Sequence, residues 1–290
     1  MRLNEFKRSG HWPTLLCAFL YFDMSFMAWT LMGALGVYIA QDFHLTPGQK
    51  GLLVAIPLLG GSILRIVLGV ATDRCGPRKV GLSGLTLTII PLLWGWLHSI
   101  SIGDLAGIGL MLGVAGASFA VALPLASRWY PARFQGLALG IAGAGNSGTV
   151  AAALLAPRLA EHFGWRAVFA LTAIPVAITL VVFWRLARES PNRPPVRPLR
   201  CYLDLLRQSD LWCFAGFYMV TFGGFVGLFR AANPIIDRSG HELCNPFERK
   251  IAVFLDQVDQ ALLAEFTKII FRLGDAVTVG EENFARVKLD

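Results

Sequence analysis

The stretch GLLVAIPLLGGSILRIVLGV, residues 51–70, is apolar throughout except for Ser62 and Arg65. Its length matches the roughly 20 residues that cross a lipid bilayer as a helix. A cation at the centre of a membrane helix costs about 2.5–3.5 kcal/mol or more, so a chain keeps one there where it faces a cavity and has something to bind. We therefore expect a helical membrane protein in which Arg65 faces a cavity and binds an anion.

The composition of the whole chain agrees with a membrane protein. Its 290 residues are 55% hydrophobic and 16% charged, with a mean hydropathy of +0.56. Soluble domains carry about 25% charged residues. The sequence predicts an all-α membrane protein, and Trp and Tyr gather near the expected helix ends, as they do at membrane–water interfaces. The predicted spans cover residues 14–40, 51–71, 80–98, 105–127, 135–157, 167–187 and 211–229.

The net charge of +7 could suggest a nucleic-acid partner, but the charge is distributed as membrane topology requires. Basic residues concentrate on one side of the first six spans, whereas the other side has Lys50, Arg158 and Arg166. The positive-inside rule then makes the N-terminus cytoplasmic in a multi-pass protein of the inner (plasma) membrane, with lipid and not nucleic acid around it. The residues on the basic side are Arg2, Lys7, Arg8, Arg74, Arg78, Lys79, Arg128, Arg133 and the six arginines from Arg185 to Arg207.

The chain divides into four segments by composition. Residues 1–187 hold six spans, and residues 188–210 form a Pro- and Arg-rich linker that we expect to be cytoplasmic. A seventh span at 211–229 precedes a tail at 230–290. Apolar residues recur every three to four positions between Ile251 and Leu273, which predicts a short amphipathic helix in the tail and no eighth span.

An eleven-residue motif follows the second span. It reads Gly69-x-x-x-Asp73-Arg74-x-Gly76-x-Arg78-Lys79. We expect Gly69 to let two helices approach closely, and the cations to pair with Asp73 or with neighbouring helix ends. Such charge pairs can lock one conformation of a helix bundle that rocks between two states, and they break when it opens. The alternative is that the motif only holds its loop on the cytoplasmic side.

The fifth span contains a second motif, rich in glycine. Small residues at spacings of three and four allow another helix to pack backbone against backbone, and helix packing alone would account for the glycines. It does not account for Asn146, whose amide is costly in hydrocarbon unless it meets a partner. The motif glycines are Gly136, Gly140, Gly143, Gly145 and Gly148.

These motifs resemble those of a known family. The Gly69–Lys79 pattern resembles that of the major facilitator superfamily, over the first six spans. The fifth-span motif resembles the first signature of the nitrate/nitrite porter family. Three further segments agree with that family: Leu64-Arg65-Ile66, Gly116-Ala-Ser-Phe-Ala120 and YMVTFGGFVG at 218–227. The resemblance implies the six-helix N-terminal half of a major facilitator bundle, and transport of nitrate or nitrite by proton symport or nitrate/nitrite antiport without a cofactor.

The resemblance also implies a set of substrate ligands. Arg65 resembles the family's nitrate ligand in span two, and its planar guanidinium suits a planar oxyanion better than a lysine would. Tyr218 would add a hydroxyl donor. Phe119 and Phe222 resemble the pair that sandwiches nitrate, although ordinary core or lipid packing is the alternative for both rings. Asn146 is predicted as a further substrate-binding residue, and with Gly143 it would let span five bend or slide against its neighbours.

Asp23 is an acid inside the first span. An ionisable residue within the membrane is a functional candidate by default, and the hypothesis for Asp23 is proton coupling. Pairing with a basic side chain near the headgroups is the alternative. No Ser/His/Asp, Cys/His or metal-ligand grouping is in reach of an aqueous site, so the sequence predicts neither an enzyme nor a metal site.

The sequence departs from the family after Leu228. There the chain continues as FRAANPIIDRSG, residues 229–240, a hydrophilic segment instead of the rest of a span. The family has twelve spans in two halves, and the second half carries a second nitrate-binding arginine and a second signature. We expect a truncated or rearranged porter with impaired transport. Two alternatives stay open: a half-sized carrier completed by a homodimer or a second half-transporter, and a non-transporting protein whose tail helix docks a partner.

Overall fold

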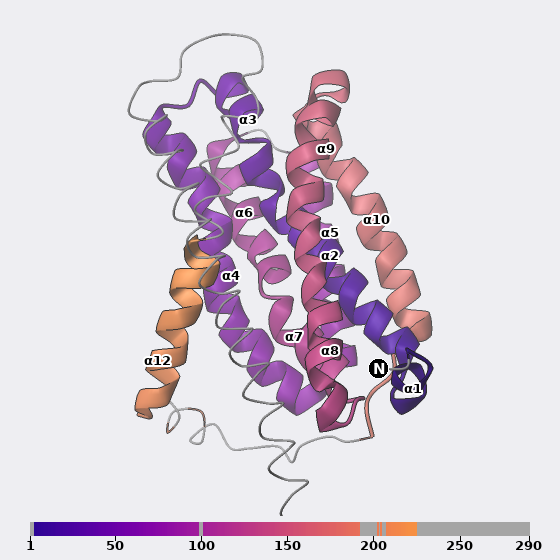
Figure 1. The fold of residues 1–290 in the computed structure, drawn as a ribbon. Coiled ribbons are helices and arrows are strands. Elements are labelled where there is room, and N and C mark those ends of the chain that lie inside the picture. The colour runs from indigo at the N-terminus through magenta and orange to yellow at the C-terminus, as the bar shows by residue number, and fades with distance from the viewer. Residues whose placement is uncertain (1–2, 99–100, 192–201, 203, 205–206, 225–290) are drawn as a thin grey trace, which may run out of the picture. The chain divides into compact units, whose positions relative to one another are not determined.

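The computed structural model describes residues 3–98, 101–191, 202, 204 and 207–224, and the regular structure in these residues is helical (Figure 1). The chain falls into two units, residues 1–207 and 208–290. Residues 225–290, and with them the predicted tail helix, lie outside the described part.

The first unit contains the six predicted spans, which are confirmed by length and composition. A short helix α1 (Leu3–Ser9) comes first. The first three spans are α2 (Trp12–Ala34), α4 (Pro47–Cys75) and α5 (Pro77–Leu97), with α3 (Gly36–Asp42) between α2 and α4. The fourth span is divided into α6 (Ile102–Gly116) and α7 (Phe119–Ser127). The fifth consists of α8 (Ala132–Gly143), the 3₁₀ turn η1 (Ala144–Asn146) and α9 (Ser147–Phe163), and the sixth is α10 (Trp165–Leu186).

Local sequence signals explain where these helices begin and end. Thr46 and Gln49 form a capping box at the start of α4, because each side chain satisfies a backbone N–H of the first turn. The turn from α4 to α5 runs through Gly76, whose φ of 91° is a backbone conformation that side chains disfavour. Pro77 then starts α5, where its missing N–H costs nothing.

Helix α2 forms the centre of the first unit. It packs against α9 and α10 on one side and against α6 and α7 on another (Figure 1). Of the six spans, α2 buries the largest share of its residues and α4 the smallest. Large apolar side chains of α4 are exposed, including Leu59, Ile63 and Ile66. This face is suited to lipid or to another helix.

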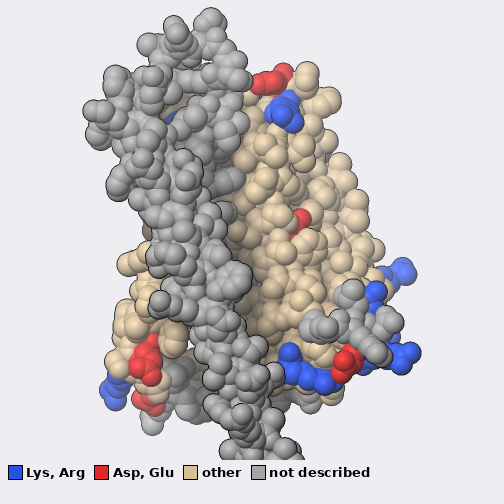
Figure 2. Space-filling view, in the orientation of Figure 1, with Lys and Arg blue, Asp and Glu red and all other residues tan. Residues whose placement is uncertain are grey.

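Charged side chains of the first unit gather near the two ends of its helices. Figure 2 shows Lys, Arg, Asp and Glu at the upper and lower margins of the visible face of this unit, with an acidic side chain exposed in the otherwise uncharged surface between them. That distribution is the one a bilayer demands, since the hydrocarbon region disfavours charge.

The second unit begins with α12 (Ser209–Tyr218) and continues in a π-helical turn, η2 (Met219–Gly223). These elements cover the first part of the predicted seventh span. The remainder of that span, from residue 225, is not among the described residues.

Candidate functional site

Arg65 lies half-buried in α4 beside the break in the fourth span. Its Nη2 donates a hydrogen bond of 3.2 Å to the carbonyl oxygen of Gly116, and its guanidinium carbon lies 5.8 Å from the ring centroid of Phe119. A guanidinium within about 6 Å of a ring is attracted by the negative face of that ring. The structure thus brings together Arg65 and Phe119, which the sequence analysis took from two separate segments.

The break between α6 and α7 makes the Gly116 carbonyl available. The amide of Ala120 would donate to this oxygen in a continuous α-helix. Here it donates instead to the carbonyl of Ala117, at 3.1 Å. The carbonyl at the end of α6 can therefore accept from Arg65.

Aromatic rings of α2 continue the wall that Phe119 begins. The Phe119 and Phe22 ring centroids are 5.4 Å apart, Phe22 and Phe26 are 4.2 Å apart, and Phe26 and Trp29 are 5.0 Å apart. These α2 residues were not among the site residues predicted from the sequence. Their spacing of four and three positions was the available signal, because it places all three on one helix face.

Asn146 and Asp23 lie close together in the structure. Asn146 ends the turn η1 between α8 and α9, and its side-chain oxygen is buried without a hydrogen-bond partner among the described residues. The next residue, Ser147, places its hydroxyl 2.6 Å from the carboxylate of Asp23. Asp23 is 9% exposed. Within the described residues its side chain thus meets a hydroxyl donor of α9 and not a basic residue.

The glycine motif of span five has two different environments. A Cβ on Gly145 would lie 2.9 Å from the backbone nitrogen of Asp23, and one on Gly148 would overlap the Asp23 carbonyl. These two glycines hold α9 and η1 tightly against α2. A Cβ on Gly136, Gly140 or Gly143 would meet no atom of the described residues within 4 Å, so this part of the motif lies on a face of α8 that the described residues leave open.

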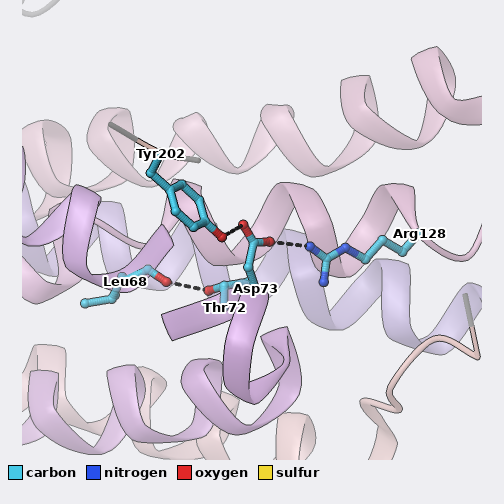
Figure 3. A network of polar contacts seen from close by, with 5 residues as sticks. All are labelled: Leu68, Thr72, Asp73, Arg128 and Tyr202. Carbon is cyan, nitrogen blue, oxygen red and sulfur yellow. Dashed lines mark hydrogen bonds and ion pairs between the residues drawn. The ribbon is translucent and has the colours of Figure 1, made fainter. Parts of the chain in front are cut away.

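The motif after span two forms what we call the Asp73 cluster, shown in Figure 3. One carboxylate oxygen of Asp73 accepts from Arg128 at 2.7 Å, and the other accepts from the hydroxyl of Tyr202 at 3.0 Å. Thr72 donates to the carbonyl of Leu68 at 2.7 Å. The cluster ties the end of α4 to the end of α7 and to the segment that follows α10.

The cations of the motif lie apart from Asp73. The Arg78 backbone N–H donates to the carboxylate of Glu189 at 2.9 Å, and its side chain donates to the carbonyl of Trp184 at 3.0 Å. Arg74 and Lys79 are exposed. A Cβ on Gly69 would lie 4.0 Å from that of Ala120, which is an ordinary contact.

Tyr218 and Phe222 belong to the second unit. Tyr218 is the last residue of α12 and is partly exposed, and Phe222 lies within η2. Their predicted roles as nitrate ligands stay predictions.

Comparison with known proteins decides the family. The sequence model of the Major Facilitator Superfamily matches residues 17–242. This chain belongs to the major facilitator superfamily. The match extends beyond Leu228, where the resemblance noted from the motifs ended.

Relatives within the superfamily are nitrate and nitrite transporters by name. The chain is 36% identical over 207 residues to the probable nitrate/nitrite transporter NarK2 of Mycobacterium tuberculosis, covering 70% of this chain and 52% of that protein. It is 33% identical over 201 residues to the nitrite extrusion protein of Bacillus subtilis, covering 69% and 51%. It is 33% identical over 239 residues to the probable nitrate/nitrite antiporter NarK1 of Thermus thermophilus, covering 77% and 53%. These relatives confirm the resemblance to the nitrate/nitrite porter family.

The chain spans about half the length of the curated relatives it matches. Among solved structures, it is similar to the inward-open xylose transporter XylE of E. coli at 17% identity, with a TM-score of 0.47, covering 79% of this chain and 56% of that one.

Proposed function

We propose that this chain supplies the Arg65-bearing half of a nitrate/nitrite carrier in the inner (plasma) membrane, with its N-terminus in the cytoplasm. The observation that carries the proposal is the placing of the Arg65 guanidinium beside Phe119 at the break in span four. A guanidinium offers a planar fork of donors to a planar oxyanion. An aromatic wall next to it excludes water, which strengthens the attraction between the cation and the anion.

Proton coupling through Asp23 is a second part of the proposal. The carboxylate is largely buried and sits at the joint between α2 and η1, next to the glycine motif. Protonation would remove a negative charge from that joint and change its hydrogen bond with Ser147. A movement of span five would then be linked to proton uptake. If transport is instead an exchange of nitrate for nitrite, this linkage is not needed.

A complete carrier requires a second half, since substrate sites in this kind of transporter lie between two repeats. Two surfaces of the first unit suit such a partner: the open glycine face of α8 and the exposed apolar face of α4. We propose that a second copy of the chain, or a separate half-transporter, covers them. The docking alternative rests on the predicted helix at 251–273, which is outside the described residues.

The test is nitrate uptake into proteoliposomes that contain only the purified chain, with and without a proton gradient. Arg65→Lys keeps the charge but removes the fork, and we expect it to abolish uptake. Arg166→Lys is the matched control, because Arg166 is an exposed residue near Asp42 and away from the site. Uptake unaffected by Arg65→Lys would contradict the proposal. No uptake by the folded wild-type chain would contradict completion by a second copy of the chain, and would leave a separate half-transporter and the non-transporting protein as the two interpretations.

Proton coupling has its own readout in the same vesicles. Asp23→Asn mimics the protonated carboxyl, so it should leave uptake that no longer responds to the proton gradient. A response equal to that of the wild type would remove Asp23 from the mechanism.

A further inference from the structure

Trp29 is a buried member of the aromatic wall, and its indole N–H has no role in the proposed function. Its side chain is in α2 and the residue is 4% exposed. The indole Nε1–H donates a hydrogen bond of 2.9 Å to the carbonyl oxygen of Pro57 in α4. A buried indole N–H requires such a partner. This bond joins α2 to the helix that carries Arg65.

The same indole lies against the backbone that holds Arg65. A Cβ on Gly116 would overlap the indole ring, and a Cβ on Gly61 would lie 3.3 Å from its Nε1. Trp29 thus fills the space that side chains at both positions would take. Gly116 is also the residue whose carbonyl accepts from Arg65 at 3.2 Å. The ring and the guanidinium are therefore in contact with the same residue, one through its Cα and the other through its carbonyl.

The register of this arrangement is fixed where α4 crosses α6. A Cβ on Gly113 would overlap the backbone of Gly60, and a Cβ on Gly60 would lie 2.7 Å from the carbonyl oxygen of Leu110. The two backbones touch at this crossing, so α6 cannot slide along α4 without a clash. Pro57, Gly61 and Arg65 follow at intervals of four along α4 and share one face. The indole bond and the Arg65 bond are thus made by the same face of the helix.

We propose that Trp29 is a positioning residue for Arg65, and that it sets the direction in which the guanidinium presents its donors. The indole supports Gly116 from behind, which keeps the carbonyl at the break of span four within reach of Arg65. Its bond to Pro57 holds α2 and α4 together about two turns before Arg65. The importance of this positioning for transport rests on the proposed function. The contact between Trp29 and Gly116 does not depend on that function, and the experiment tests the positioning role and the anion site separately.

Phenylglyoxal, which modifies arginine side chains, measures how firmly each guanidinium is held. The purified full-length chain is treated in detergent, and the modification rate is read for the Arg65 and Arg128 peptides by mass spectrometry. A guanidinium that loses a charge-assisted hydrogen bond should react roughly three- to tenfold faster. Trp29→Phe keeps a ring but removes the N–H that bonds to Pro57. If the indole positions Gly116, this change weakens the bond from Arg65 to the Gly116 carbonyl, and we expect the faster reaction at Arg65.

Gly116→Ala is the second variant, because its methyl group would displace the indole from the other side of the contact. The matched control is Trp96→Phe, an identical change at a 48% exposed position of α5. It should leave the rate at Arg65 unchanged. Arg128 reports on the fold as a whole, since its side chain is 15% exposed and paired with Asp73.

An unchanged rate at Arg65 in both Trp29→Phe and Gly116→Ala overturns the inference. Equal acceleration at Arg65 and Arg128 also overturns it, because Trp29 would then act on the fold and not on one guanidinium. Added nitrate tests the proposed function separately by protecting Arg65 in the wild type. A Trp29 effect without nitrate protection supports the positioning role and contradicts the anion site. Nitrate protection without a Trp29 effect supports the anion site and overturns the positioning role.

Discussion

The guanidinium of Arg128, at the end of α7, lies 2.7 Å from a carboxylate oxygen of Asp73, near the end of α4. The two residues are 55 positions apart in the sequence. Their side chains are 15% and 37% exposed, so the pair is partly removed from solvent. The second oxygen of Asp73 accepts from Tyr202, which satisfies the carboxylate on both sides. A link of this kind can hold two spans together at one end while their other ends move.

Breaking this pair should cost more than breaking an exposed one. We expect Asp73→Asn to lower the free energy of unfolding by about 1 kcal/mol, because Arg128 loses its partner in a partly buried place. The control is Glu5→Gln, which breaks the ion pair between Glu5 and Arg133. The side chains of these two residues are 52% and 65% exposed. That change should cost about 0.5 kcal/mol or less. Denaturant unfolding in detergent measures both, and equal costs would contradict the distinction.

The two halves of the glycine motif should respond differently to alanine. Gly148→Ala places a methyl group on the carbonyl of Asp23, and we expect a loss of about 2 kcal/mol or more as α9 is pushed away from α2. Gly136→Ala adds a methyl group to an open face, so stability should stay within about 1 kcal/mol of the wild type. Thermal unfolding compares the two. If Gly136→Ala nevertheless lowers nitrate uptake, that face contacts a partner in the working carrier.

The six spans could be predicted because hydrophobicity acts on whole helices. A run of about 20 apolar residues has few alternatives to crossing the bilayer, and the structure has a helix at each such run in residues 1–187. The breaks within spans four and five could not be predicted this way. They depend on which backbone hydrogen bonds form near Gly116 and Ala144, and the average hydropathy of a span does not report those bonds.

The partner of Asp73 shows a second limit of prediction from the sequence. Its nearest cations in the sequence are Arg74 and Arg78, yet the ion pair is made with Arg128, which had entered the argument only as a charge that sets topology. Charge patterns report the side of the membrane, whereas pairing depends on how helix ends meet. Arg65 and Phe119 could be paired in advance because a family resemblance placed them together. Trp29 could not, since only the packing at Gly116 shows its position.

The hydrogen bond between Ser147 and Asp23 should contribute measurably to stability. Ser147→Ala removes the hydroxyl that lies 2.6 Å from a largely buried carboxylate, and we expect a loss of about 1–3 kcal/mol. Ser62→Ala is the matched control, since that hydroxyl is exposed and bonds to the carbonyl of Leu58 within its own helix. It should change stability by about 0.5 kcal/mol or less. Equal effects of the two variants would show that Asp23 does not depend on Ser147.

His11 should make stability fall at mildly acidic pH. Its Nδ1 lies 2.7 Å from the hydroxyl of Thr14 and accepts from the Thr14 backbone N–H, capping α2, while Thr14 accepts in turn from the backbone N–H of Arg188. Burial, and then the charge of Arg188, lower the pKa of His11 below its ordinary value of 6.5. Because the folded state binds the proton less readily than the unfolded state, this contribution is complete above pH 6.5 and is lost as the pH falls from 6.5 through the folded pKa.

A variant that caps the helix without titrating separates this effect from other groups. His11→Asn keeps a good capping side chain that does not titrate. The stability of this variant should therefore fall less than that of the wild type between about pH 7.5 and pH 5.5. The measurement is the thermal midpoint of each protein across that range, and the difference between the two curves cancels the carboxylates that titrate in both. Parallel curves would mean that the proton on His11 is not linked to folding. Diverging curves would identify the junction of α2 with the segment after α10 as the pH-sensitive contact, because Thr14 joins the two.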